Sequence, residues 1–460
     1  MSPTQIIDES VPANLEPRFV AIKKRLIKPE NIDKVTQSWK QILVELDKEL
    51  TRIAEAGPSY VPKCDFSEIK DTNKLPPKIS ALFKQRGVIM VDNVIDTPQI
   101  DLWFNELVEF CKDNPETAGY TFPNPTAWYN IFWTKPQTEA RFHPNMKKLF
   151  KTMANEFHVD DESTLLDLDT QIVYGDRIRI REPGSTATLP LHLDSSSIER
   201  WEDIMYSKVY EPIFNGEWED WDPFKLDERT TASENLYEHI EEGKSTICSA
   251  FRTLQGWLAL SNNKSGEGTL RVLPNIKLTM AYIMLRPFFW QDPKSGNLDD
   301  YEIDLDTPKF PGTVPGQGQL FLDKFYHHLH KGVISIPDVK KGSFVFWHAD
   351  VAHEVDHEHN GDSVSSVLYY GQTPLTEGNI KTLLDTRHAF LNNISPEDYR
   401  SQLSEEDKKK EYQGADFAHF GEDMDSKRSM GLVPFEISED LTEGQKRVRQ
   451  LANEAISKQA

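Results

Sequence analysis

The sequence predicts an α+β protein with a β-rich centre and helical segments at both ends. From about 165 to 375, short β-branched and aromatic runs are separated by Gly, Pro and Asn, a spacing that is typical of a β-barrel or β-sandwich. Before and after this region, apolar residues recur every three or four positions, which is the period of an amphipathic helix. We therefore expect one β core with helices added at its two ends.

The N-terminal part predicts helices around a single strand. Residues 35–53 carry an apolar stripe that stops at Gly57-Pro58, as in a long amphipathic helix. The stretch 78–113 then predicts a helix, the apolar strand VIMVDNV, and a second helix with Thr97 as its N-cap and Pro98 as its first residue. Another helix is expected over NMKKLFKTMANEF.

The C-terminal part returns to helices after residue 376. Ser395-Pro396 opens one of them, and Thr442 with Gln445 has the pattern of a capping box at the start of the last. These patterns divide the chain into an N-terminal arm and helix (1–77), a central domain (78–375) with its β core at about 165–375, and a helical extension (376–460) that packs on the core.

Composition narrows the class of partner and the compartment. The chain has 460 residues, with 74 Asp and Glu against 52 Lys and Arg, a formal net charge of -22 that repels nucleic acids and anionic membranes at long range. Its three cysteines are too few and too widely spaced for a disulfide framework or a cysteine zinc site. Because there is no signal-peptide pattern and no apolar run of about 18 residues, we expect a cytoplasmic protein without a membrane partner. The oligomeric state stays open.

The stretch HEVDH at 353–357 matches the signature of zinc peptidases, which requires a helix to bring its two histidines together. The flanking residues are β-branched and aromatic on both sides of an Asn360-Gly361-Asp362 turn, and they predict a β-hairpin. On a strand, residues four apart are separated by about 13 Å, too far to share one zinc ion. A zinc peptidase is therefore the less favoured alternative.

A different metal site is indicated by LPLHLD, which holds His192 and Asp194. Two residues apart on a strand, their side chains point to the same face. With one distant histidine, they would form the two-histidine, one-carboxylate set that holds Fe(II) and leaves other positions open. An ordinary surface contact between His192 and Asp194 is the alternative, but His353 lies on a later predicted strand of the same β region.

The order LHLD, QGWLALSNNKSGEGTLRVLP and KKGSFVFWHADVAHEV resembles the phytanoyl-CoA dioxygenase-like oxygenases that use Fe(II) and 2-oxoglutarate. LHLDSSSIERW, FNGEWEDWDPF, FRTLQGW, LRPFF and WHADVAHEV are more closely similar to the YbiU-like branch of fungi and bacteria, known as domain of unknown function 1479. The resemblance implies a double-stranded β-helix core of the jelly-roll or cupin type. It also implies His192, Asp194 and His353 as the iron ligands.

The same resemblance implies a non-haem dioxygenase that hydroxylates a small molecule while 2-oxoglutarate is decarboxylated to succinate. His348 lies where these enzymes often have a histidine, so it is either a second-shell hydrogen-bond partner of the site or a packed core residue. A metal-binding or ligand-binding β-helix protein without turnover is the alternative function.

The sequence departs from the family where many relatives have an arginine for the far carboxylate of 2-oxoglutarate, about ten residues after the distal histidine. Ser363 stands there, and the next arginine, Arg387, lies 34 residues after His353 (387 minus 353). A buried carboxylate needs a cationic partner, so another arginine must serve if this co-substrate binds. Arg252 is favoured because its segment otherwise reads as core. The remaining candidates are Arg179, Arg181 and Arg271. Arg179 and Arg181 share one face of a predicted strand with Arg177, and a solvated strand face is the alternative interpretation of these three.

Two aromatic and histidine clusters are less specific. Trp218 and Trp221 lie in the acidic segment FNGEWEDWDPF, where they form either a lid over the substrate or ordinary loop packing. His327, His328 and His330 could ligate a metal, but their isolation favours surface histidines.

Overall fold

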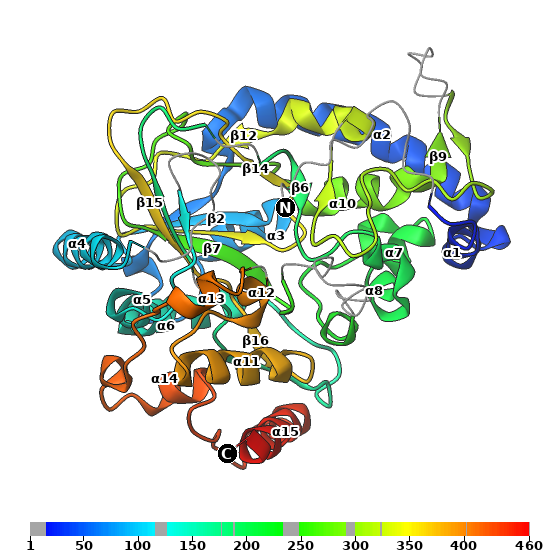
Figure 1. The fold of residues 1–460 in the computed structure, drawn as a ribbon. Coiled ribbons are helices and arrows are strands. Elements are labelled where there is room, and N and C mark those ends of the chain that lie inside the picture. The colour runs from blue at the N-terminus through cyan, green and yellow to red at the C-terminus, as the bar shows by residue number, and fades with distance from the viewer. Residues whose placement is uncertain are drawn as a thin grey trace.

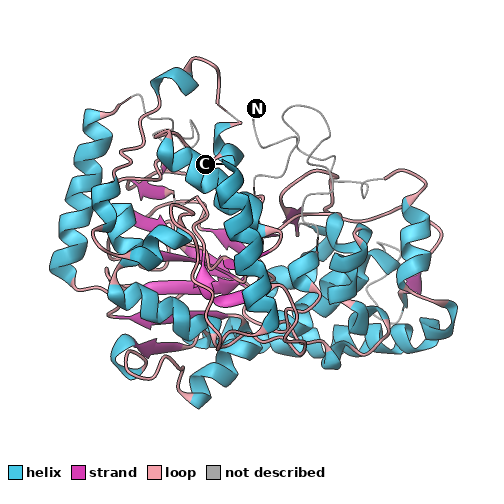
Figure 2. Cartoon of the chain, turned by 90° about the horizontal axis from the view of Figure 1, so that it is seen from below, coloured by secondary structure: helices cyan, strands magenta, loops and turns pink. Residues whose placement is uncertain are grey.

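The computed structural model describes residues 15–115, 127–175, 177–186, 189–232, 248–290, 300–322, 324–401 and 403–459. Its strands form two main sheets, and apart from the parallel pair β1–β2 their neighbours are antiparallel (Figure 2). The larger sheet has the order β1 (Lys63–Asp65), β2 (Val88–Asp92), β13 (Phe344–His348), β7 (Leu254–Ala259), β15 (Ser365–Tyr369), β5 (Ile178–Arg181) and β3 (Trp128–Tyr129). The smaller has the order β11 (Leu320–Phe321), β6 (His192–Leu193), β14 (His353–Val355), β8 (Leu270–Val272) and β12 (Ile334–Ser335).

Two short strand pairs complete the β structure: β16 (Pro374–Thr376) with β4 (Leu166–Gln171), and β9 (Phe289–Trp290) with β10 (Glu302–Ile303). The longer α-helices are α1 (Phe19–Leu26), α2 (Ile32–Ala56), α3 (Pro77–Arg86), α4 (Thr97–Asp113), α5 (Lys135–Phe142), α6 (Pro144–Ala154), α10 (Ile276–Leu285), α11 (Asn379–Leu391) and α15 (Glu443–Gln459). Shorter ones are α7 (Glu199–Glu202), α8 (Ile204–Val209), α9 (Glu211–Phe214), α12 (Glu397–Arg400), α13 (Asp407–Lys410) and α14 (Met424–Ser429). No helix among the described residues is both long and apolar enough to cross a membrane.

Alternating side chains give the larger sheet two apolar faces. Along β13, Val345 and Trp347 belong to the cluster that also contains Leu193 of the smaller sheet, so they point between the two sheets. The intervening Phe344 and Phe346 belong to a second cluster, which includes residues of α4 and α6. The first face therefore lines the interior that carries the site, while the second is covered by helices.

The segment 342–371 does not form the predicted hairpin. β13 and β15 both pair with β7 and lie on either side of it, while β14, between them in sequence, pairs with β6 and β8 in the smaller sheet. The sequence predicts one strand on each side of the turn at 360–362, whereas the structure has β13 and β14 before it and β15 after it. Hydrophobic patterning also carries no information about which sheet each strand joins. The chain therefore crosses between the sheets twice in this stretch.

The predicted helices are present, with one correction at an N-cap. Asp96, not Thr97, caps α4, because its carboxylate accepts the Gln99 N–H. The capping box of α15 is confirmed: Thr442 Oγ1 accepts the Gln445 N–H at 3.2 Å, and Gln445 Oε1 accepts the Thr442 N–H at 2.9 Å. In Figure 1, α2 (blue) and α15 (red) lie on opposite sides of the sheets.

Candidate metal centre

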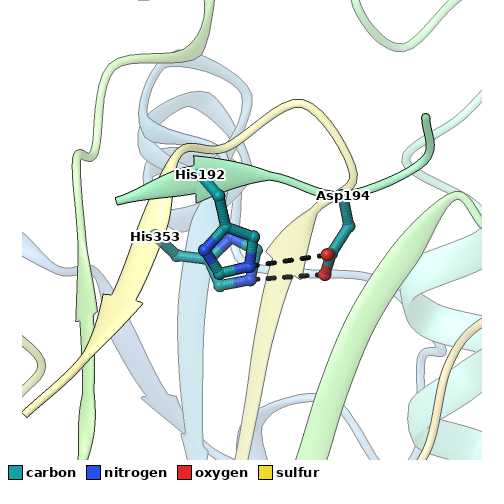
Figure 3. Close-up of side chains that lie close together, drawn as sticks. All are labelled: His192, Asp194 and His353. Carbon is teal, nitrogen blue, oxygen red and sulfur yellow. Dashed lines mark ion pairs between the residues drawn. The ribbon is translucent and has the colours of Figure 1, made fainter. Parts of the chain in front are cut away.

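Three side chains from the smaller sheet converge on one point. His192 on β6 and His353 on β14 are directly opposed across the two antiparallel strands, and Asp194 follows β6 at once. Each offers one ligand atom within 4.8 Å of the other two. The Nε2 atoms of both histidines lie 3.4 Å from an oxygen of Asp194, as the dashed lines of Figure 3 show. The expected pairing of the H-x-D residues with the distal histidine is therefore present in space.

The ring orientation of both histidines is fixed by the backbone. Nδ1 of His192 donates to Pro190 O at 2.8 Å, and Nδ1 of His353 donates to Val351 O at 3.0 Å. With the proton on Nδ1, the lone pair of each Nε2 points at the centre of the group. Nε2 of His192 is fully buried and makes no hydrogen bond with any described residue. A bound metal ion would satisfy this atom, so the residues present fit such an ion.

The carboxylate of Asp194 is held by two glutamines. Gln255 on β7 donates to Oδ2 at 2.7 Å, and Gln319 donates to Oδ1 at 2.9 Å. Both contacts were missed by sequence reasoning. Gln255 could have been noticed as a polar residue within a buried apolar strand, whereas nothing in the sequence marks Gln319.

The turn after Asp194 is conformationally unusual. Ser195 and Ser196 are buried and have φ angles of 65° and 78°, a left-handed region that non-glycine residues seldom occupy. Arg200 supports this turn, since its Nη2 donates to Asp194 O at 2.5 Å while Nη1 pairs with Asp350 at 2.6 Å. A buried ion pair thus fixes the backbone of the carboxylate ligand.

The protonation states suit metal binding. Burial alone favours the neutral carboxyl of Asp194, but the two facing imidazoles, in their protonated form, outweigh it and hold the pKa of Asp194 well below the usual value. Burial, reinforced by His192, lowers the pKa of His353. The site therefore combines an ionised carboxylate with a neutral imidazole at His353, which are the forms that ligate metals.

A family model described as Gig2-like matches residues 13–432, which is most of the chain. The chain belongs to the Gig2-like family. Among solved structures, it is similar to GlcNAc Inducible Gene 2, GIG2 (DUF1479), from Candida albicans, with 69% identity, a TM-score of 0.92, and coverage of 98% of this chain and 97% of that one.

Two bacterial members are more distant. YbiU of Escherichia coli, an uncharacterized protein, is 28% identical over 378 residues, which is 78% of this chain and 85% of that protein. A structure from Salmonella typhimurium LT2, described as a "Putative Oxidoreductase", is 26% identical with a TM-score of 0.75, and the match covers 93% of this chain and 100% of that one. The resemblance to the YbiU-like, DUF1479 branch is thereby confirmed.

The candidate arginines of this Gig2-like protein differ in their surroundings. Arg179 and Arg181 share one face, as predicted, but that face is buried and not solvated. All five N–H groups of Arg181 are committed to local groups: Ser185 Oγ and O, Gly268 O, Asp356 O and His357 O. Arg181 is therefore a structural residue and no longer a candidate for the co-substrate.

Arg179 and Arg252 keep hydrogen-bonding capacity. Arg179 donates to Ser365 Oγ at 3.2 Å, while its buried Nε has no partner among the described residues. Arg252 makes no hydrogen bond there at all, and its Nε is also buried. Arg271, in contrast, pairs with Glu354 at 2.7 Å and is 37% exposed. Ser363, where relatives have an arginine, is exposed.

His348 is a packed core residue, and the alternative prediction, that it hydrogen-bonds a metal ligand, is wrong. It is buried on the helix-covered face of β13, where its ring lies beside Phe157 and Phe224. Nε2 donates to Pro223 O at 3.0 Å, and Nδ1 accepts the Asp350 N–H at 3.0 Å. Neither ring nitrogen contacts a residue of the triad.

The predicted lid is also corrected. Trp218 and Trp221 are 6% and 2% exposed and belong to the main core cluster, with Trp221 packed against Tyr210 at 5.5 Å between ring centroids. Such burial leaves no side chain to open and close over a substrate. The acidic residues of this segment had suggested an exposed loop, but its aromatic residues anchor it in the core.

The described histidines of HEVDH and YHHLH other than His353 do not join the site. HEVDH lies on strand β14 and beyond it, with the His357 side chain 64% exposed, so the helical geometry of a zinc peptidase is absent. In the YHHLH cluster, His330 is exposed and His328 lies against Tyr282, whereas the side chain of His327 falls outside the described residues.

Proposed function

We propose that this protein is a non-haem Fe(II)- and 2-oxoglutarate-dependent oxygenase that hydroxylates a small molecule. The observation that carries the proposal is the triad of His192, Asp194 and His353, in which both Nδ1 atoms are anchored and both Nε2 atoms face one carboxylate. Two imidazoles and one carboxylate on one face are the ligand set of Fe(II) oxygenases.

The strand order supports the proposed double-stranded β-helix. From β5 onward, β5, β7, β13 and β15 belong to the larger sheet, while β6, β8, β11, β12 and β14 belong to the smaller one. The strands of the two sheets thus alternate along the chain, except that β8, β11 and β12 follow one another in the smaller sheet. This is the winding of a jelly roll, and it brings the ligands on β6 and β14 together.

Each residue has a defined task in the proposed site. His192, Asp194 and His353 would hold the metal, and Gln255 and Gln319 orient the carboxylate. When bound, Fe(II) with 2-oxoglutarate supplies dioxygen activation and oxidation of a C–H bond of the substrate, with succinate as the co-product. Both imidazoles are buried, so bulk water has little access to them.

For the far carboxylate of 2-oxoglutarate, we assign Arg179. It lies on β5 opposite Val367 of β15, and directly opposed residues share a face, so its side chain points between the sheets. Its guanidinium reaches Ser365, two residues beyond the exposed Ser363. Arg179 of β5 would then take the place of the arginine that many 2-oxoglutarate oxygenases carry about ten residues after the distal histidine.

The test is an anaerobic titration of metal-free protein with Fe(II) and then 2-oxoglutarate, monitored by the visible charge-transfer band of the chelated co-substrate. We expect a band in the wild type and none in Asp194→Ala or His353→Ala. Glu354→Ala is the matched control, because this carboxylate pairs with Arg271 away from the triad, and it should keep the band. A zinc peptidase would show the reverse pattern in a peptide hydrolysis assay.

A binding protein without turnover is the second candidate, and the serine at position 363 favours it. Succinate release distinguishes the two candidates. If 2-oxoglutarate binds but no succinate forms in air with any pool of small molecules, the oxygenase proposal gives way to a binding role.

A further inference from the structure

Arg252 is a partly buried cation for which the described residues offer no acceptor. It lies two residues before the start of β7, and its guanidinium makes no hydrogen bond or ion pair with any residue in the described ranges. The described group beside it is the ring of Tyr174, 5.5 Å from its Cζ to the ring centroid. The buried Nε–H of Arg252 has no partner among the described residues, and an unsatisfied buried donor is unfavourable. Such a guanidinium is suited to bind an anion.

The neighbouring carboxylates are engaged elsewhere. Asp398 of α12 accepts the Tyr174 hydroxyl at 2.9 Å and the Ser249 N–H at 2.7 Å. Asp194 is held by its two glutamines. Burial alone lowers the pKa of Arg252, but Cys248, Tyr174 and Asp194 together raise it above its usual value. The arginine therefore stays charged and is electrostatically coupled to the triad.

The backbone around Arg252 is rigid. The Asn379 side chain bonds both polar groups of Phe251, with Oδ1 accepting its N–H and Nδ2 donating to its carbonyl, each at 2.9 Å. On the other side, Thr253 N–H donates to Gln372 O at 3.0 Å. Gly371 leaves the room that the side chain needs, since a Cβ there would lie 3.1 Å from Arg252 Cδ. The backbone that carries Arg252 is thus fixed before any ligand arrives.

Arg252 and Arg179 lie toward opposite ends of β7. Gln255 of β7 contacts Asp194, and Arg252 comes before Gln255 in the sequence. Ala259, at the other end of β7, comes after it. Ala259 and Arg179 both lie opposite Val367 of β15, so they are at the same level. In the proposed function, 2-oxoglutarate has one carboxylate left after it chelates the metal, so it can satisfy one of the two arginines. With Arg179 assigned to that carboxylate, Arg252 needs a second anion.

We propose that Arg252 binds an anionic group, a carboxylate or a phosphate, of the molecule that is oxidised, so that the substrate is a small organic anion. This inference rests on the proposed function. Tyr399 of α12 interacts electrostatically with Arg252, and Asp398 of the same helix bonds the hydroxyl of Tyr174 beside it, so in this proposal the C-terminal extension forms part of the substrate site. In a chain with a formal charge of -22, a fixed local cation is what allows an anion to bind.

The test uses protein loaded with Mn(II) and 2-oxoglutarate, with acetate, inorganic phosphate and neutral acetamide as probes. Paramagnetic broadening of the ¹³C and ³¹P resonances reports binding near the metal. We expect saturable broadening of acetate or phosphate but not of acetamide, and the probe that binds more tightly identifies the anion class. Arg252→Gln should weaken this binding at least about 10-fold, which is typical for the loss of a charge-assisted hydrogen bond. Arg252→Lys should restore part of it.

Arg447→Gln, at an exposed position on α15, is the matched control and should leave probe binding unchanged. The affinity of each variant for 2-oxoglutarate, from the anaerobic Fe(II) band, separates the possible failures. Unchanged probe binding in Arg252→Gln overturns the inference while leaving the oxygenase intact. A loss of 2-oxoglutarate affinity in Arg252→Gln, with none in Arg179→Gln, also overturns it and makes Arg252 the co-substrate anchor. Absence of the band in the wild type removes the proposed function and this inference together.

Discussion

The ligand residues of the triad differ in what orients them. Each histidine ring is fixed by a carbonyl two residues earlier in the chain, that of Pro190 for His192 and that of Val351 for His353. The carboxylate of Asp194, in contrast, depends on side chains that come from β7 and from residue 319. The amides are therefore the part of the site that a distant change in the fold can disturb.

Replacing Gln255 by Leu tests this dependence. The substitution removes the 2.7 Å hydrogen bond to Asp194 and puts an apolar side chain of similar size in its place on β7. We expect Fe(II) to bind about 10- to 100-fold more weakly, the usual cost of losing a partner that orients a metal ligand. Fe(II) affinity is measured by anaerobic titration, with Gln319→Leu as the parallel variant. Unchanged affinity in the double variant would show that the amides do not orient the carboxylate.

His348 predicts a pH dependence of stability. Burial lowers its pKa from 6.5 to about 4, so the folded protein keeps the ring neutral where the unfolded chain takes up a proton. Its contribution is therefore complete above pH 6.5 and is lost as the pH falls toward 4, by up to roughly 3 kcal/mol. We expect the difference in free energy of unfolding between wild type and His348→Asn to shrink by about that amount between pH 7 and pH 4. A constant difference would contradict the assignment.

The three residues of the candidate metal centre could be predicted from the sequence, but the roles of the arginines could not. H-x-D places its two side chains on one face by strand geometry alone, and the distal histidine lies in a recognisable β segment. Whether each of Arg179, Arg181 and Arg252 is structural or free to bind a ligand depends on which carbonyls and hydroxyls the fold brings to its guanidinium. That information is tertiary, as the five local acceptors around Arg181 illustrate.

Among the elements, strands were located more reliably than their partners. The pattern around HEVDH indicated β structure and so argued correctly against a helical zinc site. It could not show that β14 leaves the sheet of β13 and β15, because a buried strand has the same composition in either sheet. Helix ends were predicted within a residue where a capping side chain was present, as at α4 and α15.

The capping box of α15 gives a prediction for that element. Thr442→Ala removes the acceptor for the Gln445 N–H, which should destabilise the protein by about 1 kcal/mol in urea unfolding. Because α15 packs on β4 and not on the smaller sheet, Fe(II) affinity should stay unchanged. A loss of Fe(II) binding in this variant would mean that the extension controls the metal ligands themselves.

At the scale of the molecule, the N-terminal helix and the β core share one hydrophobic cluster. Trp39 of α2 stacks on Phe289 and Tyr282, at 4.8 and 5.3 Å between ring centroids, and the same cluster reaches Val367 of β15. The boundary proposed at residue 77 stays a prediction. The shared cluster makes independent unfolding of residues 1–77 unfavourable.

Trp39→Ala tests whether the two parts unfold together. Truncating a fully buried tryptophan should cost about 3 to 5 kcal/mol and lower the midpoint of the whole transition. Urea unfolding followed by far-ultraviolet circular dichroism and by loss of Fe(II) binding should give coincident curves in wild type and variant. Separate transitions would indicate that the N-terminal part folds on its own.

The hydrogen bonds from Asn379 to the backbone of Phe251 have a consequence for substrate selection. This residue opens α11 in the C-terminal extension, yet its side chain fixes Phe251, next to Arg252, without touching the triad. In the proposed function, mutations in the extension can therefore change how the anion is selected while His192 and His353, on β6 and β14, stay as they are. The residues that select the substrate and those that hold the metal would then lie in separate stretches of the chain.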